Sequence, residues 1–250
     1  MVNFLFKKSY NLKNFTKIPY DHLWGSRGVF TTVRVHGKDQ QYILLKEHLS
    51  QLNKSLKKIK IDFYLTQKKL FELIPKNINT KKTDYLLRIA IKKNILSMSL
   101  RPRLKLSNNF QCKLVNYQRS NAKIKNLQYK KILKMQKSIN MQKIELLFLS
   151  KKKLLEGSTT NLIIIKNNHI ILPRGEYYKG VTLKFLLSKI QNKYFTKTIQ
   201  LSNLSYADEI ILVGSGKGIV KVRSIPEIKW YSTSSKMFKR LISIYNTQLT

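Results

Sequence analysis

KKKLLEGSTTNLIIIKNNHII, residues 151–171, sets one acid and a run of small hydroxyl residues between two apolar segments. Leu162–Ile165 predicts a buried strand, and Asn167-Asn168 predicts a two-residue turn into a second strand, which together make a β-hairpin. Glu156 is one of only 12 acids among 250 residues. An acid held beside a hairpin indicates a partner, although the segment taken alone is more simply a turn with local capping.

The composition is that of a folded protein with a strong positive charge. With 42% hydrophobic residues, 250 residues suffice for one large domain or two small ones. The net charge of +37, from 49 basic against 12 acidic residues, would ordinarily indicate a polyanionic partner. The basic residues are spread over the whole chain, however, and lysine accompanies heavy use of Asn and Ile, as an AT-rich coding sequence produces. Nucleic-acid binding is therefore the minority interpretation.

Cysteine use and hydropathy bear on location. Cys112 is the only cysteine, so an intrachain disulfide or a multi-cysteine metal site is excluded, which suits a reducing compartment. No apolar run is long enough to cross a bilayer, so we expect no membrane partner. The first twenty residues lack the apolar core and cleavage site of a secretory signal. We expect a cytoplasmic protein, and an organelle transit role stays open.

Hydrophobic periodicity predicts a mixed α and β protein. The predicted strands cover residues 28–35, 42–45, 85–91, 95–100, 111–117, 144–149, 162–165, 169–172, 196–201, 209–213 and 219–222. The predicted helices cover residues 47–59, 67–74 and 127–138, with others starting near residues 181 and 234. The polar segment 119–122 lacks a period and predicts a linker between an N-terminal domain, 1–118, and a C-terminal domain, 123–250.

Three further positions accompany Glu156. Lys123 is in isolation a solvated charge, but at a domain junction its amine could be partly desolvated and so become a usable nucleophile. Gly180-Val181-Thr182 precedes an amphipathic helix, whose free N–H groups suit a phosphate. Gly214–Gly218, GSGKG, follows an apolar strand and allows a nest of N–H donors, although it matches neither nucleotide fingerprint and could be a plain turn. Two phosphate cradles, a scarce carboxylate and a lysine describe a site for pyridoxal 5'-phosphate.

At these residues the sequence resembles the class IV pyridoxal-phosphate enzymes, which include branched-chain aminotransferase, D-amino-acid aminotransferase and aminodeoxychorismate lyase. The motifs occur in the family's order: GVFTTVRV at 28–35, LLKEHLSQL at 44–52, KIKNL at 123–127, EGSTTN at 156–161, KGVT at 179–182 and YADEIILVGSGKG at 206–218. The resemblance implies an α+β, two-domain fold of the D-amino-acid aminotransferase type (fold type IV), with the cofactor between the domains. It also implies a homodimer.

The resemblance assigns roles to individual residues. Lys123 becomes the Schiff-base lysine and proton shuttle. Glu156 pairs with the pyridine nitrogen, and Thr160 and Asn161 support Glu156 or the cofactor. The remaining assigned residues hold the cofactor phosphate (Val181, Thr182, Ser215 and Gly216) or lie on the substrate side (Arg34 and Thr32).

Several positions depart from the family pattern. Gln51 and Leu183 stand where the family usually has arginines around the phosphate, so positive charge is lost beside a group of nearly two negative charges. Lys54 or Lys217 could compensate, or cofactor affinity could be reduced. Leu127 occupies the place of a tyrosine in branched-chain enzymes, which argues mildly against that activity.

The Thr31-Thr32 pair bears on the choice of reaction. Aminotransferases of the family typically have Glu at position 31, whereas a Thr pair resembles aminodeoxychorismate lyase, which converts 4-amino-4-deoxychorismate to p-aminobenzoate and pyruvate in folate biosynthesis. We therefore expect the lyase. The alternatives are a branched-chain or D-amino-acid aminotransferase, and a basic nucleic-acid-binding protein on a degenerate scaffold.

Overall fold

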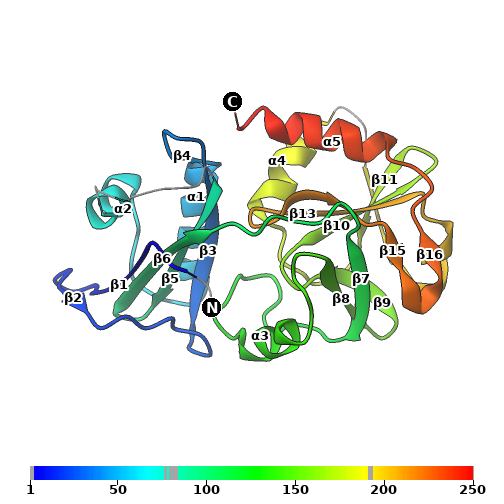
Figure 1. Ribbon diagram of the computed structural model, residues 1–250. Helices are drawn as coiled ribbons and strands as arrows, with labels where there is room; N and C mark the ends of the chain where they lie inside the picture. Colours follow the sequence, from blue (N-terminus) through cyan, green and yellow to red (C-terminus); the bar gives the residue numbers. More distant parts are fainter. Residues whose placement is uncertain (1–2, 76–77, 79–83, 191–193, 250) are drawn as a thin grey trace. The chain divides into compact units, whose positions relative to one another are not determined.

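A computed structural model (Figure 1) describes residues 3–75, 78, 84–190 and 194–249. The chain forms two compact units. The first contains the residues up to Arg103 together with Ile124–Lys131, and the second contains Leu104–Lys123 and Ile132–Gln248. The division after Arg103 differs from the predicted linker at 119–122. The reason is that strand β7, Gln111–Asn116, pairs in parallel with β8, Ile144–Ser150, and so belongs to the second unit.

The first unit is a six-stranded sheet with two helices. Its strands are β1 (Phe6–Asn11), β2 (Lys17–Ile18), β3 (Gly28–His36), β4 (Gln41–Tyr42), β5 (Asp84–Lys92) and β6 (Ile95–Pro102), in the order β2-β1-β6-β5-β3-β4. Helix α1 (Leu45–Lys58) packs on β3, and α2 (Gln67–Leu73) follows it. Leu49, Leu52 and Leu56 share one buried face of α1, as the spacing predicted.

Residues 124–127 form an edge of this first unit. The Phe30 amide donates to the Lys125 carbonyl at 2.9 Å, and the Leu127 amide donates to the Gly28 carbonyl at 2.9 Å. Because this segment is bound in extended form to β3, helix α3 begins only at Lys130 and ends at Lys137, later than the predicted start at Leu127.

The second unit contains two five-stranded sheets. One has the order β12-β11-β10-β13-β14 and the other β16-β15-β7-β8-β9. Their remaining strands are β9 (Lys153–Gly157), β10 (Asn161–Lys166), β11 (His169–Pro173), β12 (Tyr194–Lys197), β13 (Glu209–Gly214), β14 (Gly218–Lys221), β15 (Ser224–Ile225) and β16 (Trp230–Tyr231). A single apolar cluster joins residues of both sheets, including Leu147 and Leu154 with Leu162 and Leu212. Helices α4 (Val181–Lys189) and α5 (Lys236–Asn246) contact the first of these sheets (Figure 1).

The opening stretch folds as predicted. Asn167 and Asn168 have φ values of 48° and 61°, which is the left-handed backbone of a tight hairpin turn between β10 and β11. On its other edge β10 pairs with β13. Glu156 lies on β9, which pairs with β8, so the EGSTTN segment connects the two sheets of the second unit.

Several short elements differ from those that the hydrophobic periodicity predicted. The predicted strand 196–201 is replaced by β12, which ends at Lys197, and by a 3-10 helix η1 at Leu201–Tyr206. Strands β1, β15 and β16 and the 3-10 helix η2 (Pro226–Ile228) were not predicted, because they are short or lack alternation. None of the helices in the described part of the chain has the length and apolar character needed to cross a membrane.

Candidate active site

Glu156 is the buried carboxylate that the sequence singled out, and its side chain is only 5% exposed. Its partner is Arg119, whose Nε donates to Oε1 at 2.8 Å and whose Nη2 donates to Oε2 at 2.5 Å. The Arg119 side chain is 8% exposed. A two-point contact between guanidinium and carboxylate fixes both groups in direction as well as in charge. Glu156 therefore has a charged partner within the chain, which the sequence did not identify.

Tyrosines surround this ion pair. The Tyr177 hydroxyl is buried and has no hydrogen-bond partner among the described residues, and its pKa is raised to about 12 by burial and then by the charge of Glu156. Burial likewise raises the pKa of Tyr178 to about 12, against the opposing effect of Arg119. A buried hydroxyl without a partner is costly, which is an argument for a ligand group beside Glu156.

The two predicted phosphate cradles meet in the second unit. The Thr182 hydroxyl lies 3.0 Å from the Ser215 hydroxyl, which joins the start of α4 to the turn between β13 and β14. Gly180 caps α4 without a side-chain hydrogen bond, so the amides of the first helical turn have no partner within the helix. Hydroxyl groups beside a helix N-terminus are a donor set for a phosphate.

Asn161 supports this cradle rather than Glu156. Its Oδ1 accepts from the Gly180 amide at 2.8 Å, and its Nδ2 donates to the Tyr178 carbonyl at 2.6 Å. A Cβ at Gly180 would lie 2.9 Å from the Asn161 Oδ1, so the close approach requires glycine. Asn161 thereby fixes the chain just before α4.

A second buried carboxylate, Glu145, binds the hydroxyl run. It is fully buried and accepts from Ser158 at 2.5 Å, Thr159 at 2.7 Å and Thr160 at 3.3 Å. Lys217 of the GSGKG turn lies 3.3 Å from the same carboxylate, with its side chain 8% exposed. The suggestion that Lys217 compensates for missing arginines at the phosphate is therefore wrong, because its ammonium is neutralised inside the protein. Thr160 likewise supports Glu145 and not Glu156.

Lys123 and Lys125 have different surroundings. The Lys123 side chain is 68% exposed and its Nζ lies 2.8 Å from Glu176, so its amine is not desolvated as the sequence analysis expected. Lys125 is half-buried, with its Nζ 5.0 Å from the centre of the Phe30 ring. Its charge also contributes to lowering the pKa of the buried His48 to about 3, after the larger effect of burial. Of the two lysines, Lys125 is therefore the less exposed.

The substrate-side predictions fall on β3. Arg34 is buried, and its Nε and Nη2 donate to Asp84 at 2.7 and 2.8 Å, a carboxylate that also accepts from Arg103 at 2.9 Å. Thr32 is half-buried and pairs in register with Arg88 of β5. Thr31 points to the other face of the sheet, where its hydroxyl lies 2.7 Å from His48 Nδ1.

An aromatic cluster that the sequence did not reveal lies beside Lys125. Trp24 stacks on Tyr129 at 5.5 Å and meets Phe30 edge-on at 4.8 Å. The Arg88 guanidinium lies 3.8 Å from the Trp24 ring centre, and its buried Nε has no hydrogen-bond partner among the described residues. Burial is the main cause that lowers the Arg88 pKa to about 10. Residues so far apart in sequence could be joined only by knowing the strand register.

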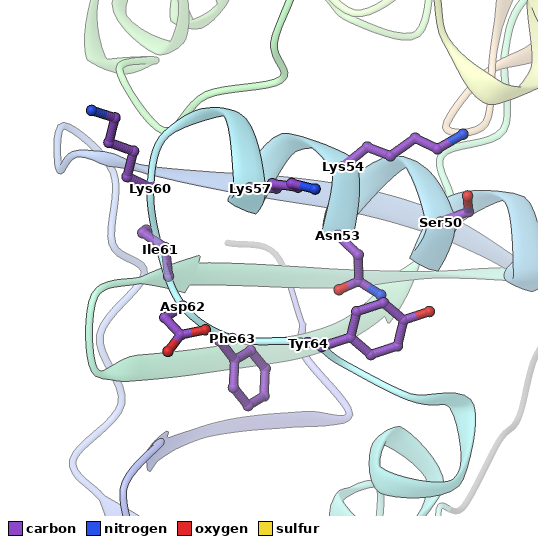
Figure 2. A pocket seen from close by; sticks show the side chains of 9 residues that line it. All are labelled: Ser50, Asn53, Lys54, Lys57, Lys60, Ile61, Asp62, Phe63 and Tyr64. Carbon is purple, nitrogen blue, oxygen red and sulfur yellow. The ribbon is translucent and has the colours of Figure 1, made fainter.

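Lys54, the other proposed compensating residue, lines an open groove of about 660 Å³ between α1 and residues 60–64. Figure 2 shows the Asn53 amide directed toward Tyr64, while Lys54 and Lys60 extend away from it. The amide of Asn53 is engaged by the Leu65 backbone at 3.1 and 3.0 Å. The groove shares no other residue with the predicted site. The side chain of Leu183, the second departure from the family pattern, is fully buried, which leaves no room for an arginine at position 183.

Comparison with known proteins agrees with this geometry. Residues 28–225 match the sequence pattern of the family described as "Amino-transferase class IV". The match covers most of the chain, and the protein therefore belongs to the class IV aminotransferases, which are enzymes that depend on pyridoxal phosphate. The predicted family, cofactor and α+β fold of type IV are thus confirmed.

The similar proteins carry the names of both aminotransferases and a lyase. A Methanocaldococcus jannaschii protein named "Putative branched-chain-amino-acid aminotransferase" is 24% identical over 82% of this chain and 81% of its own. The branched-chain aminotransferase of Thermoproteus uzoniensis has a TM-score of 0.77 at 18% identity, covering 97% and 94% of the chains. A structure from Legionella pneumophila titled "Putative 4-amino-4-deoxychorismate lyase" has a TM-score of 0.74 at 18% identity, covering 88% and 91%.

The residues of the second unit fit pyridoxal phosphate. The Thr182–Ser215 hydroxyls and the start of α4 offer donors for the phosphate, and Glu156 offers a buried carboxylate for the ring nitrogen. The Tyr177 hydroxyl adds a buried polar group that has no hydrogen-bond partner in the described part of the chain. When bound, the cofactor supplies an aldehyde that captures amino groups and a ring that withdraws electrons.

Proposed function

We propose that the protein is an aminodeoxychorismate lyase, which splits 4-amino-4-deoxychorismate into p-aminobenzoate and pyruvate. The proposal rests on Thr31, which occupies the position where aminotransferases of the family typically carry Glu. In the structure its hydroxyl meets His48, which the low pKa keeps neutral. A carboxylate at position 31 would be buried beside a neutral ring, at a substantial cost.

The proposed cofactor contacts are those of the second unit. Val181, Thr182, Ser215 and Gly216 would hold the phosphate through backbone amides and hydroxyls. Glu156 would hold the ring nitrogen, and Asn161 would keep Gly180 and the start of α4 in place. Thr160 would contribute through the Glu145 network and not through a direct contact.

The identity of the cofactor lysine is also a proposal. Lys123 follows from the motif as first matched, whereas burial and neighbouring groups favour Lys125 two residues later. We propose Lys125 as the stronger of the two, because it is half-buried and lies beside the Phe30 ring, whereas Lys123 is exposed and ion-paired with Glu176.

The two lysines are separable by chemistry. Borohydride treatment of the holoenzyme followed by peptide mass spectrometry locates the pyridoxyl group. We expect it on Lys125, abolished by Lys125→Ala and retained in Lys123→Ala, with Lys134→Ala as the exposed control. Modification that persists in Lys125→Ala and disappears in Lys123→Ala restores the first assignment.

In the proposed reaction the lysine amine accepts the proton from the carbon that bears the substrate's amino group. Loss of the enolpyruvyl group then leaves an aromatic ring. The atoms of the substrate divide completely between the two products, so the reaction needs neither water nor a second substrate. An aminotransferase, the alternative, would move the same proton but requires a 2-oxo acid to accept the amino group.

This difference provides the test. Purified holoenzyme is given aminodeoxychorismate without any 2-oxo acid, and p-aminobenzoate is followed by its fluorescence. Sustained formation of p-aminobenzoate supports the lyase. Formation of glutamate from 2-oxoglutarate and a branched-chain or D-amino acid, without p-aminobenzoate, overturns the proposal in favour of the aminotransferase.

Two further expectations accompany the proposal. We propose a homodimer, as the family resemblance implies, and sedimentation of the holoenzyme tests it. The nucleic-acid alternative instead predicts affinity for RNA or DNA that falls steeply with salt and no absorbance from a bound cofactor.

A further inference from the structure

The contact between Arg119 and Glu156 places a full positive charge beside the carboxylate that is proposed to hold the cofactor's ring nitrogen. The two side chains are 8% and 5% exposed, and two hydrogen bonds of 2.8 and 2.5 Å join them. At this depth water screens the charges little, so each strongly influences any group nearby. Glu156 therefore presents a carboxylate whose charge is already compensated.

The guanidinium meets both oxygens of the carboxylate, one through Nε and one through Nη2. An ionised carboxylate oxygen can accept more than one hydrogen bond, so this contact is compatible with a second donor. Both charges act on the same neighbour, since the pKa of Tyr117 is raised mainly by burial, lowered by Arg119 and raised again by Glu156. A group that binds beside Glu156 consequently experiences the pair and not an isolated anion.

We propose that Arg119 is a positioning residue that holds Glu156 ionised and aimed while limiting how strongly the carboxylate favours a protonated ring nitrogen. This inference rests on the proposed function. It accords with the lyase, because an elimination that creates an aromatic ring depends less on electron withdrawal by the cofactor than an amino-group transfer does.

The test compares two ligands that differ at one atom. Apoprotein is titrated with pyridoxal phosphate and with its analogue in which carbon replaces the ring nitrogen, and the dissociation constants are measured by fluorescence quenching. Because only the first ligand can carry a charge on the ring, the ratio of the two affinities reports the preference for that charge. We expect this ratio to rise about tenfold or more in Arg119→Met, which removes the guanidinium charge from beside Glu156.

Matched variants control for folding and for charge. Arg119→Lys keeps the positive charge and should return the ratio toward that of the unaltered protein. Arg119→Gln keeps a hydrogen-bond donor without the charge, so it decides the question should Arg119→Met fail to fold. Glu156→Gln should remove the preference in either background.

An equal ratio in the unaltered protein and in Arg119→Gln would overturn the proposal for Arg119 and leave the enzyme assignment intact. Failure of both ligands to bind any variant is a different result. It would overturn the cofactor site itself, and the role of Arg119 with it.

Discussion

Replacement of Glu145 by Gln tests the most heavily bonded carboxylate of the second unit. Glu145 is fully buried and accepts from three hydroxyls, from the Leu146 amide at 3.1 Å and from Lys217 at 3.3 Å. Glutamine keeps the shape but removes the charge, and its amide hydrogens face groups that are themselves donors. Breaking a buried pair on one side costs about 3–5 kcal/mol, which would lower Tm by about 6–20 °C in a protein of this size.

The reciprocal change should cost less. Lys217→Met leaves Glu145 with its hydroxyl donors, so the loss should approach that of one charged hydrogen bond, about 1.5–3 kcal/mol. In the double variant neither charge is stranded, and its loss should be smaller than the sum of the two single losses by about 1–3 kcal/mol. Lys113→Met, an exposed lysine on β7 of the same sheet, should stay within about 0.5 kcal/mol of the unaltered protein.

Urea unfolding measures these differences. Trp230 is 3% exposed and lies in the second unit, so its fluorescence in a Trp24→Phe background reports this unit alone. A Glu145→Gln protein as stable as the unaltered one would refute the reasoning. Strict additivity in the double variant would show that Glu145 and Lys217 are not energetically coupled.

Three other changes have defined outcomes. Burial lowers the pKa of His48 to about 3, so below pH 6.5 the unfolded chain binds a proton there that the folded protein does not. The free energy of unfolding should therefore fall as the pH drops below 6.5, by about 2 kcal/mol at pH 5. In urea unfolding at several pH values, His48→Asn should remove most of this dependence. Asp84→Asn should lower the free energy of unfolding by about 2–3 kcal/mol, because it removes the carboxylate from the buried Arg34 guanidinium. Parallel thermal melts should show that the control Asp39→Asn has an unchanged Tm. Glu209→Gln should lower the free energy of unfolding by about 1–2 kcal/mol, because the buried carboxylate accepts at 2.9 Å from two amides in the first turn of α5. Loss of helical circular dichroism before the main transition would show that α5 frays.

The sequence predicted those parts of the fold that depend on local pattern. The Asn167-Asn168 hairpin and the amphipathic α1 follow from turn chemistry and from a 3.6-residue period, and both are present. The contacts divide the chain after Arg103 and not at 119–122, because the parallel pairing of β7 with β8 is a long-range contact that alternation does not encode. The short strand β15, which pairs with β16 and β7, was not predicted for the same reason.

The residues of the candidate site show the same difference between features set by local sequence and features set by long-range contacts. Glu156 and the meeting of Thr182 with Ser215 were predicted, since scarcity of acids and glycine-bounded turns are visible in the sequence. Arg119 was placed in a featureless linker, and nothing in its neighbours marks it as buried. Lys123 and Lys125 differ by only two residues, and their burial is decided by the pairing of residues 124–127 with β3, a tertiary contact.

An acid within an apolar strand is a sequence signal for a buried carboxylate that needs a neutralising partner. Among the described residues the buried acids are Glu145, Glu156 and Glu209, and each lies at or next to an end of its strand, β8, β9 or β13, where its strand neighbours are mostly apolar. Each has a specific neutralising group: a lysine, an arginine, or the start of a helix. In a chain of +37 charge a buried cation is easily supplied, so each scarce acid becomes a point where distant segments are joined. The same reasoning requires Arg119 and Lys217 to be far less replaceable than the surface lysines around them, and a substitution scan of the basic residues that found all of them equally tolerated would contradict it.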